Sequence, residues 1–215
     1  MSMKSIFERA DTHWAFQPIR KPIIPDSEFP NPIDAFVEHN LKKHSLTLAK
    51  PANRQTIIRR LYHDLIGLKP TFGQIHAFLE EQAPDAYAKM VDQLLDSPRF
   101  GERWGRHWLD VARYADTKGY LAGGESRAYP YAYTYRDWVI KALNEDLPYD
   151  EFIRKQMAAD FLTDQPNHPD LAALGFLTVG PVFLNRKQLI IDDQIDLVTR
   201  CLLYTSPSPR DEQSS

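Results

Sequence analysis

The densest group of chemically versatile side chains lies between residues 102 and 116, where acids, bases and a histidine alternate. His107, Asp110 and Tyr114 stand three and four residues apart, so they share one face of a helix. A histidine beside a carboxylate can act as a general base together with the group that orients it. Because the connections that follow are short, we expect further charged residues to join this set. The candidate polar cluster comprises His107, Asp110, Arg113, Asp116, Arg136, Asp137 and Asp160.

Two interpretations of the candidate polar cluster remain open at this point. As a site, it would use Asp116 or Asp160 as the second carboxylate that glycoside chemistry requires. As a structural network, its Arg–Asp pairs would hold neighbouring helices together, since perturbed ionic groups often serve packing. Both interpretations predict that the cluster converges in space. We also expect Trp104, Trp108 and Val111 to form the core-facing side of the same helix.

A loop rich in glycine, tyrosine and serine follows at residues 119–130. Tyrosine rings stack well against sugars, so the loop is a candidate for ligand contact, and it could equally cover the core. Its Gly123-Gly124 pair is not a phosphate loop, because no GxxxxGK[ST] pattern surrounds it, and no histidine has the HExxH spacing of a metal site. We therefore predict no metal. The candidate ligand-loop aromatics are Tyr120, Tyr129, Tyr131 and Tyr133.

Composition narrows the class of protein. The 215 residues are 43% hydrophobic and 26% charged, which is typical of a globular domain. A formal net charge of −3 provides no attractive field for polyanions, so we expect no nucleic-acid partner. No apolar run approaches the roughly 18 residues of a membrane-spanning helix, and the first residues contain no apolar signal-peptide core. The single cysteine, Cys201, leaves the preceding residues without a thiolate metal site.

The expected elements are helices. Four prolines between residues 18 and 30 predict that residues 1–30 form an extended N-terminal arm. From residue 31 to residue 200 apolar residues recur at helical spacing between capping signals, and no alternating strand pattern occurs. The fold class is therefore all-α, an irregular multi-helix domain with an extended proline-rich arm. We expect helices over 31–41, 57–67, 71–79, 87–95, 97–115, 135–143 and 152–161, with another beginning at 192.

The last fifteen residues have a different character. The run CLLYTSPSPRD matches the translation of a transposon-end adapter of sequencing libraries, so we expect residues 201–215 to be an artefact of the DNA and the native protein to be truncated near Arg200. An apolar stretch before this point would then lack its natural partner and be poorly anchored. That stretch comprises Leu171, Leu174, Phe176, Leu177, Val182, Phe183 and Leu184.

Several long strings resemble one family over residues 13–200. They are NPIDAFVEHNL, RRLYHDLIGLKPT, GERWGRHWLDVARYADT and the pair YRDW and NEDLPYDEF. The chain resembles the planctomycete cytochrome-associated domain of unknown function 1549, the PSCyt type. The resemblance implies an exported or periplasmic protein of planctomycetes and related bacteria, although this chain shows no signal peptide. It also implies a haem c attachment motif, Cys-x-x-Cys-His, soon after DLVTR. That motif is missing here, so we expect no cofactor in this chain and haem c in the full-length protein.

Three functions are consistent with these patterns. The leading interpretation is an accessory helical module of an exported, haem c-associated bacterial envelope protein, with the flanking domains as its partners. The first alternative is a carbohydrate-active enzyme domain that uses the Asp/His/Arg cluster on a polysaccharide. The second is a purely structural scaffold between domains. A polar cleft beside the tyrosine loop would favour the enzyme, and paired charges that connect helices would favour the other two.

Overall fold

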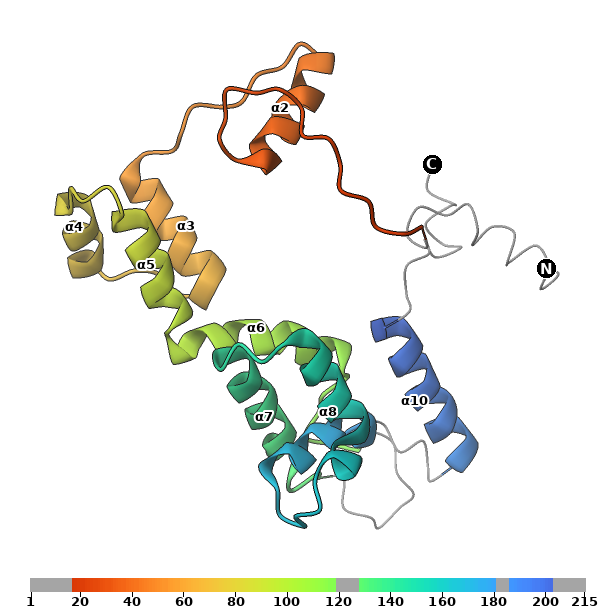
Figure 1. The fold of residues 1–215 in the computed structure, drawn as a ribbon. Helices are drawn as coiled ribbons and strands as arrows, with labels where there is room; N and C mark the ends of the chain where they lie inside the picture. Colours follow the sequence, from red (N-terminus) through yellow and green to blue (C-terminus); the bar gives the residue numbers. More distant parts are fainter. Residues whose placement is uncertain (1–16, 119–127, 181–185, 203–215) are drawn as a thin grey trace. The chain divides into compact units, whose positions relative to one another are not determined.

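The computed structural model describes residues 17–118, 128–180 and 186–202, with side chains as far as residue 199, and helices are the main regular structure of these ranges (Figure 1). The chain divides into two units, one formed by residues 1–52 and 205–215 and the other by residues 53–204. Apart from one isolated bridge between Thr117 and Ala128, the described ranges contain no β-structure. The predicted all-α class is therefore confirmed.

The described part of the first unit consists of extended chain followed by one helix. Residues 17–31 are extended or bent, as the prolines predict. Helix α2, Pro32–Lys43, begins where the Asn31 side chain accepts a hydrogen bond from the Ile33 backbone N–H at 3.0 Å. Asparagine followed by proline is a favoured start for a helix, because the asparagine satisfies a free donor and the proline has none. Ala35 is the fully buried residue of α2, so the described part of this unit has little core of its own.

The second unit begins with three helices whose ends follow local capping signals. Asn53 caps the first helix through the Thr56 backbone N–H, and Gly67 ends it in the left-handed conformation. Thr71 and Gln74 form a reciprocal capping box at the start of the next helix, as their spacing predicts. These helices are α3, Arg54–Ile66; α4, Phe72–Glu80; and α5, Ala86–Leu95. Their shared core consists of Ile58, Tyr62, Phe78, Ala86 and Leu94.

The rest of the second unit surrounds a larger core. Its elements are α6, Pro98–Val111; α7, Ala132–Asn144; α8, Tyr149–Leu162; the 3-10 helix η2, Pro169–Leu174; α9, Gly175–Thr178; and α10, Lys187–Leu202. The buried side chains include Tyr135, Trp138, Val139, Phe152, Phe176 and Leu197. Helix α10 extends two residues past Arg200 into the segment interpreted as adapter. Within the described ranges, no helix has both the length and the apolar character needed to cross a membrane.

Helices α6 and α7 pack closely because glycines face the contact. A Cβ atom on Gly101 would overlap the Ile140 carbonyl oxygen, and the Gly101 backbone N–H donates to the Asn144 side chain at 2.7 Å. The prediction of which side of α6 faces the core was therefore partly wrong. Trp104 and Val111 are 43% and 41% exposed, because two helix backbones can approach this closely only where side chains are absent.

The apolar stretch after residue 170 is anchored in the second unit. Phe176 is buried, with its ring stacked on Trp108 at a centroid distance of 5.8 Å. Ala173 and Val179 are also buried, and Leu197 of α10 belongs to the same core. The expectation that this stretch lacks a partner was wrong for residues 171–180, because η2 and α9 fold back onto α7 and α8. Val182, Phe183 and Leu184 lie outside the described residues.

Candidate functional site

Three members of the candidate polar cluster surround Tyr114, just after the end of α6. The Tyr114 hydroxyl donates to Asp116 Oδ1 at 2.6 Å, and Arg136 Nη2 lies 2.7 Å from Asp137 Oδ1. Burial, the hydrogen bond to Asp116 and that carboxylate's charge raise the pKa of Tyr114 to about 12. The charges of Arg136 and Asp137 also act on the same phenol. Asp116, Arg136 and Asp137 therefore all interact electrostatically with Tyr114.

Arg113 turns away from this group. Its backbone is left-handed, with φ of +59°, and its guanidinium forms an ion pair with Asp193 of α10. The two side chains are only 15% and 19% exposed. The expectation that Arg113 meets Asp116 and Arg136 was therefore wrong. The reversal of the chain after α6 points its side chain toward α10, and a partner eighty residues away leaves no local spacing signal.

His107, Asp110 and Asp160 do not join the others. All three are exposed, and within the described ranges no hydrogen bond or ion pair connects His107 with Asp110. The His107 ring instead lies 5.5 Å from the exposed Trp104 ring. Both residues occupy the solvent side of α6, because Gly101 and Gly105 occupy the packed side. Asp160 follows a break in α8 at Ala158 and is exposed there. The expected single cluster was wrong for these three residues.

The candidate ligand-loop aromatics separate as well. Tyr129 and Tyr131 line a hollow of about 330 Å³ between the start of α7 and the η2–α9 segment. Tyr133 is 47% exposed and lies outside that lining, and Tyr120 lies outside the described residues. Thr134 and Thr178 also border the hollow, so hydroxyl groups accompany its apolar wall.

Tyr129 is held in place from several sides. Its hydroxyl donates to the Gly180 carbonyl at 2.8 Å, and its backbone N–H donates to the Asp116 carbonyl at 2.8 Å. Burial raises the pKa of Tyr129. The Lys118 ammonium lies 5.7 Å from the centre of its ring, within range of a cation–π contact. Tyr129 thereby connects the end of the α6–α7 loop to the segment after α9.

Two polar networks in the core were not foreseen from the sequence. In the first, Trp108 and Tyr135 both donate to the amide oxygen of Gln156, at 2.8 and 2.7 Å. In the second, Asp170 of η2 accepts from the Trp138 indole at 3.0 Å and pairs with Lys155 at 2.9 Å. The sequence contains only a weak indication of the first network, namely that the polar residue Gln156 lies on the same helical face as the apolar Phe152.

The neighbours of Asp170 lower the pKa of its carboxyl group. Burial alone raises the pKa of this carboxyl, but the hydrogen bonds from Trp138 and Lys155 and the charge of Lys155 outweigh burial and lower it. Asp170 is thus held as a carboxylate between α7 and α8. In the described ranges, no group of three or more His, Cys, Asp or Glu side chains is arranged to hold a metal ion.

Comparison with known proteins identifies one family that matches the chain. A family model described as protein of unknown function (DUF1549) matches residues 32–205. The matched range includes both the candidate polar cluster and the tyrosine hollow, and it extends five residues into the segment interpreted as adapter. No curated protein and no solved structure matches the chain.

Proposed function

The chain belongs to the PSCyt2 family, described as protein of unknown function (DUF1549), and we propose that it is an accessory helical module that holds flanking domains in position. One observation carries this proposal. Arg113, which the sequence offers for chemistry, connects separate elements instead, because it pairs with Asp193 of α10. A mostly buried ion pair between distant elements is costly to break, so it favours a structural role.

The second network supports the same proposal. Lys155 of α8 and Trp138 of α7 both bind Asp170, so a single carboxylate holds η2 against two helices. The Trp138 ring also stacks on Phe152 at 5.3 Å, which aligns α7 with α8. A module that positions other domains requires this kind of rigidity between its elements.

We further propose that the complete protein is exported and carries haem c. The resemblance places a Cys-x-x-Cys-His motif soon after DLVTR, and in this chain that stretch belongs to α10. The haem segment would therefore continue from the helix that Arg113 holds.

Two cysteines are needed for both thioether bonds of this motif, and the chain has one. Expression with a haem-maturation system should give no pyridine-haemochrome signal for this chain and one for a chain extended through the motif. Covalent haem on this chain, or none on the extended chain, would contradict the proposal.

A carbohydrate-binding role is the second candidate. The hollow beside Tyr129 and Tyr131 has about 330 Å³, at the lower end of the range of small-molecule pockets. Two tyrosine rings with threonine hydroxyls suit a sugar, which presents both apolar faces and hydroxyl groups. Neither Asp116 nor Asp160 belongs to the lining of this hollow. This arrangement favours binding over hydrolysis.

Thermal melts of the wild type and three variants separate these functions. For an accessory module, Arg113→Leu should lower the melting temperature clearly, because Asp193 would lose its partner. Asp116→Asn should change it little, since Asp116 is exposed. Neutral and sulfated oligosaccharides should shift none of the melts. A ligand-dependent rise in the wild type that Tyr131→Ala abolishes would support carbohydrate binding. If Asp116→Asn instead abolished that rise and turnover of the sugar, the enzyme interpretation would be correct.

A further inference from the structure

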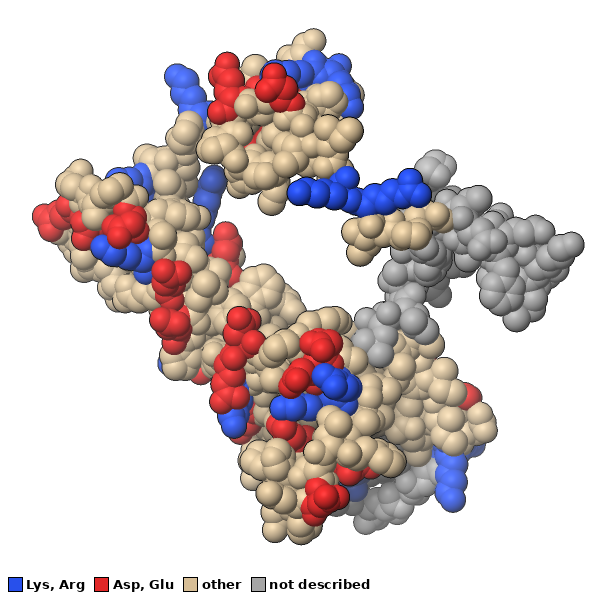
Figure 2. Space-filling model, viewed as in Figure 1, with Lys and Arg blue, Asp and Glu red and all other residues tan. Residues whose placement is uncertain are grey.

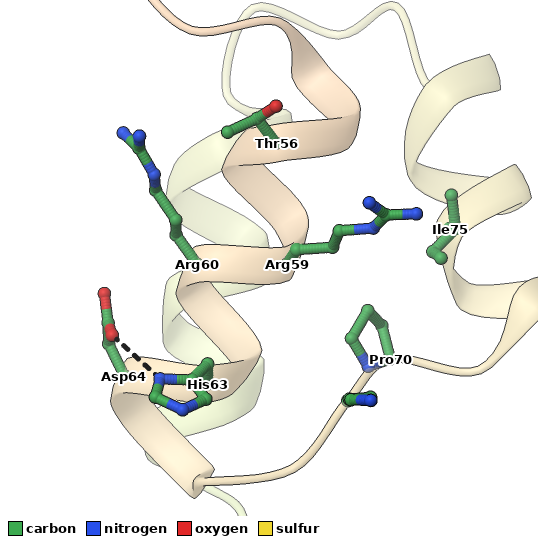
Figure 3. A pocket seen from close by; sticks show the side chains of 8 residues that line it. Thr56, Arg59, Arg60, His63, Asp64, Pro70 and Ile75 are labelled. Atoms are coloured by element: carbon green, nitrogen blue, oxygen red, sulfur yellow. Dashed lines mark hydrogen bonds and ion pairs between the residues drawn. The ribbon is translucent and has the colours of Figure 1, made fainter.

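A hollow in the second unit lies away from the candidate polar cluster, between α3 and α4. It has a volume of about 690 Å³. One wall is a single face of α3, where successive positions fall three and four residues apart, and the other wall is the turn before α4 and the start of that helix (Figure 3). The lining residues that matter here are Thr56, Arg59, Arg60, His63, Lys69 and Ile75.

The hollow concentrates unpaired positive charge. Within the described ranges, no carboxylate lies within ion-pair distance of Arg59, Arg60 or Lys69. Asp64 also lines the hollow, with 3.4 Å between its Oδ1 and the Nδ1 of His63. On the face shown in Figure 2, several basic side chains lie next to acidic ones. Elsewhere in the second unit, Lys89 pairs with Asp85 and Arg99 pairs with Glu102.

The two arginines approach the hollow from different directions. Neighbouring residues on an α-helix point about 100° apart. In Figure 3, Arg59 reaches across toward Ile75 of α4, whereas Arg60 extends away from α4 and lies above Asp64. A molecule with two separated oxyanion groups suits this arrangement, because each guanidinium can bind one of them through two parallel hydrogen bonds.

We propose that this hollow binds a small organic oligoanion, a molecule with two or more phosphate or carboxylate groups on a short carbon skeleton. The anionic groups contact Arg59, Arg60 and Lys69, and the carbon skeleton lies against Pro70 and Ile75. The volume falls within the usual range for small-molecule sites. This site is independent of the proposed positioning role, because none of its residues belongs to the interhelical networks described above.

Calorimetric titration of the full chain at low salt tests the proposal. The probes are fructose 1,6-bisphosphate, butane-1,2,3,4-tetracarboxylate and inorganic phosphate. At least one organic probe should bind roughly tenfold more tightly than inorganic phosphate, and the preferred probe identifies phosphate or carboxylate as the recognised group. Arg59→Gln and Arg60→Gln should each weaken that probe roughly tenfold. Added salt should weaken it further, since the site is open to solvent.

Two matched variants control for general electrostatic attraction. Lys89→Gln and Arg99→Gln remove the same charge from exposed helix positions outside the hollow, so each should change affinity less than about twofold. Lys69→Gln supplies a loop variant that leaves α3 untouched, and it should also weaken binding. Circular dichroism verifies that every variant is folded. The proposal is overturned if neither organic probe binds below about 1 mM, if inorganic phosphate binds equally well, or if the control variants weaken binding as much as the arginine variants.

Discussion

Gln156 is 1% exposed, yet its side chain has partners for both of its polar atoms. Its oxygen accepts from Trp108 and Tyr135, and its nitrogen donates to the Phe152 carbonyl at 3.1 Å. A polar group in a core is tolerated only when it is hydrogen-bonded, because water no longer solvates it. These bonds join α6, α7 and α8 through one amide.

Replacing Gln156 with leucine should therefore destabilise the protein by about 2–3 kcal/mol, because the Tyr135 hydroxyl loses this acceptor and the Trp108 indole keeps only its longer bond to the Tyr135 oxygen, at 3.1 Å. Tyr135→Phe should cost less, about 1 kcal/mol, since Gln156 keeps its bond from Trp108. Urea unfolding monitored by tryptophan fluorescence measures both. Equal costs for the two variants would show that the amide is not the common acceptor.

The Asp170 carboxyl predicts an acid-dependent contribution to stability. Its folded-state pKa lies below the ordinary value of 3.8, so the stabilisation is fully present above that value. It is lost as the pH falls through the lowered folded-state pKa. Asp170→Asn should therefore be less stable than the wild type at neutral pH, and the difference should shrink below about pH 4.

Asp150→Asn is the matched control for that comparison. Asp150 also pairs with a basic residue of α8, but its side chain is 77% exposed. An exposed pair contributes little, so this variant should remain within about 0.5 kcal/mol of the wild type at every pH. A pH-independent deficit for Asp170→Asn would mean that its carboxylate charge is not what stabilises η2.

At the scale of elements, the α6–α7 contact depends on the absence of side chains. Gly101→Ala should cost about 1–3 kcal/mol, because the new Cβ would overlap the Ile140 carbonyl and the helices would have to separate. Gly73→Ala in α4 meets no atom within 4 Å. It should stabilise the protein by up to about 1 kcal/mol, since alanine loses less conformational entropy in a helix. Chemical unfolding of both variants measures these opposite signs, and a neutral Gly101→Ala would show that the interface is looser than described.

At the scale of the whole molecule, both hydrophobic cores belong to residues 53–204. The described part of the first unit has one helix with one buried residue, and a lone helix of this length is marginal in water. Deletion of residues 1–52 should therefore leave the melting temperature of the remaining chain within about 2 °C. Differential scanning calorimetry measures this, and a fall of more than about 5 °C would show that the first unit contributes to the core of the second.

The sequence by itself predicted the main helices and several of their ends. Asn31, Gly67 and the Thr71–Gln74 pair act on backbone groups within a few residues, so their effect is readable from spacing alone. The start of the last helix was expected five residues too late, at 192 instead of Lys187. The family was likewise recognisable from long contiguous strings.

Only the tertiary structure decided which side of each helix is buried and which charges meet. The sequence predicted that Trp104 is a core residue. However, α6 packs against α7 through its glycine side, so Trp104 lies at the surface. The sequence predicted that Arg113 lies near Asp116, but its left-handed backbone directs its side chain to Asp193. The basic hollow on α3 needed the opposing wall from α4 before it could be recognised. Helix formation depends on neighbouring residues, whereas burial and ion pairing depend on residues that are distant in the chain.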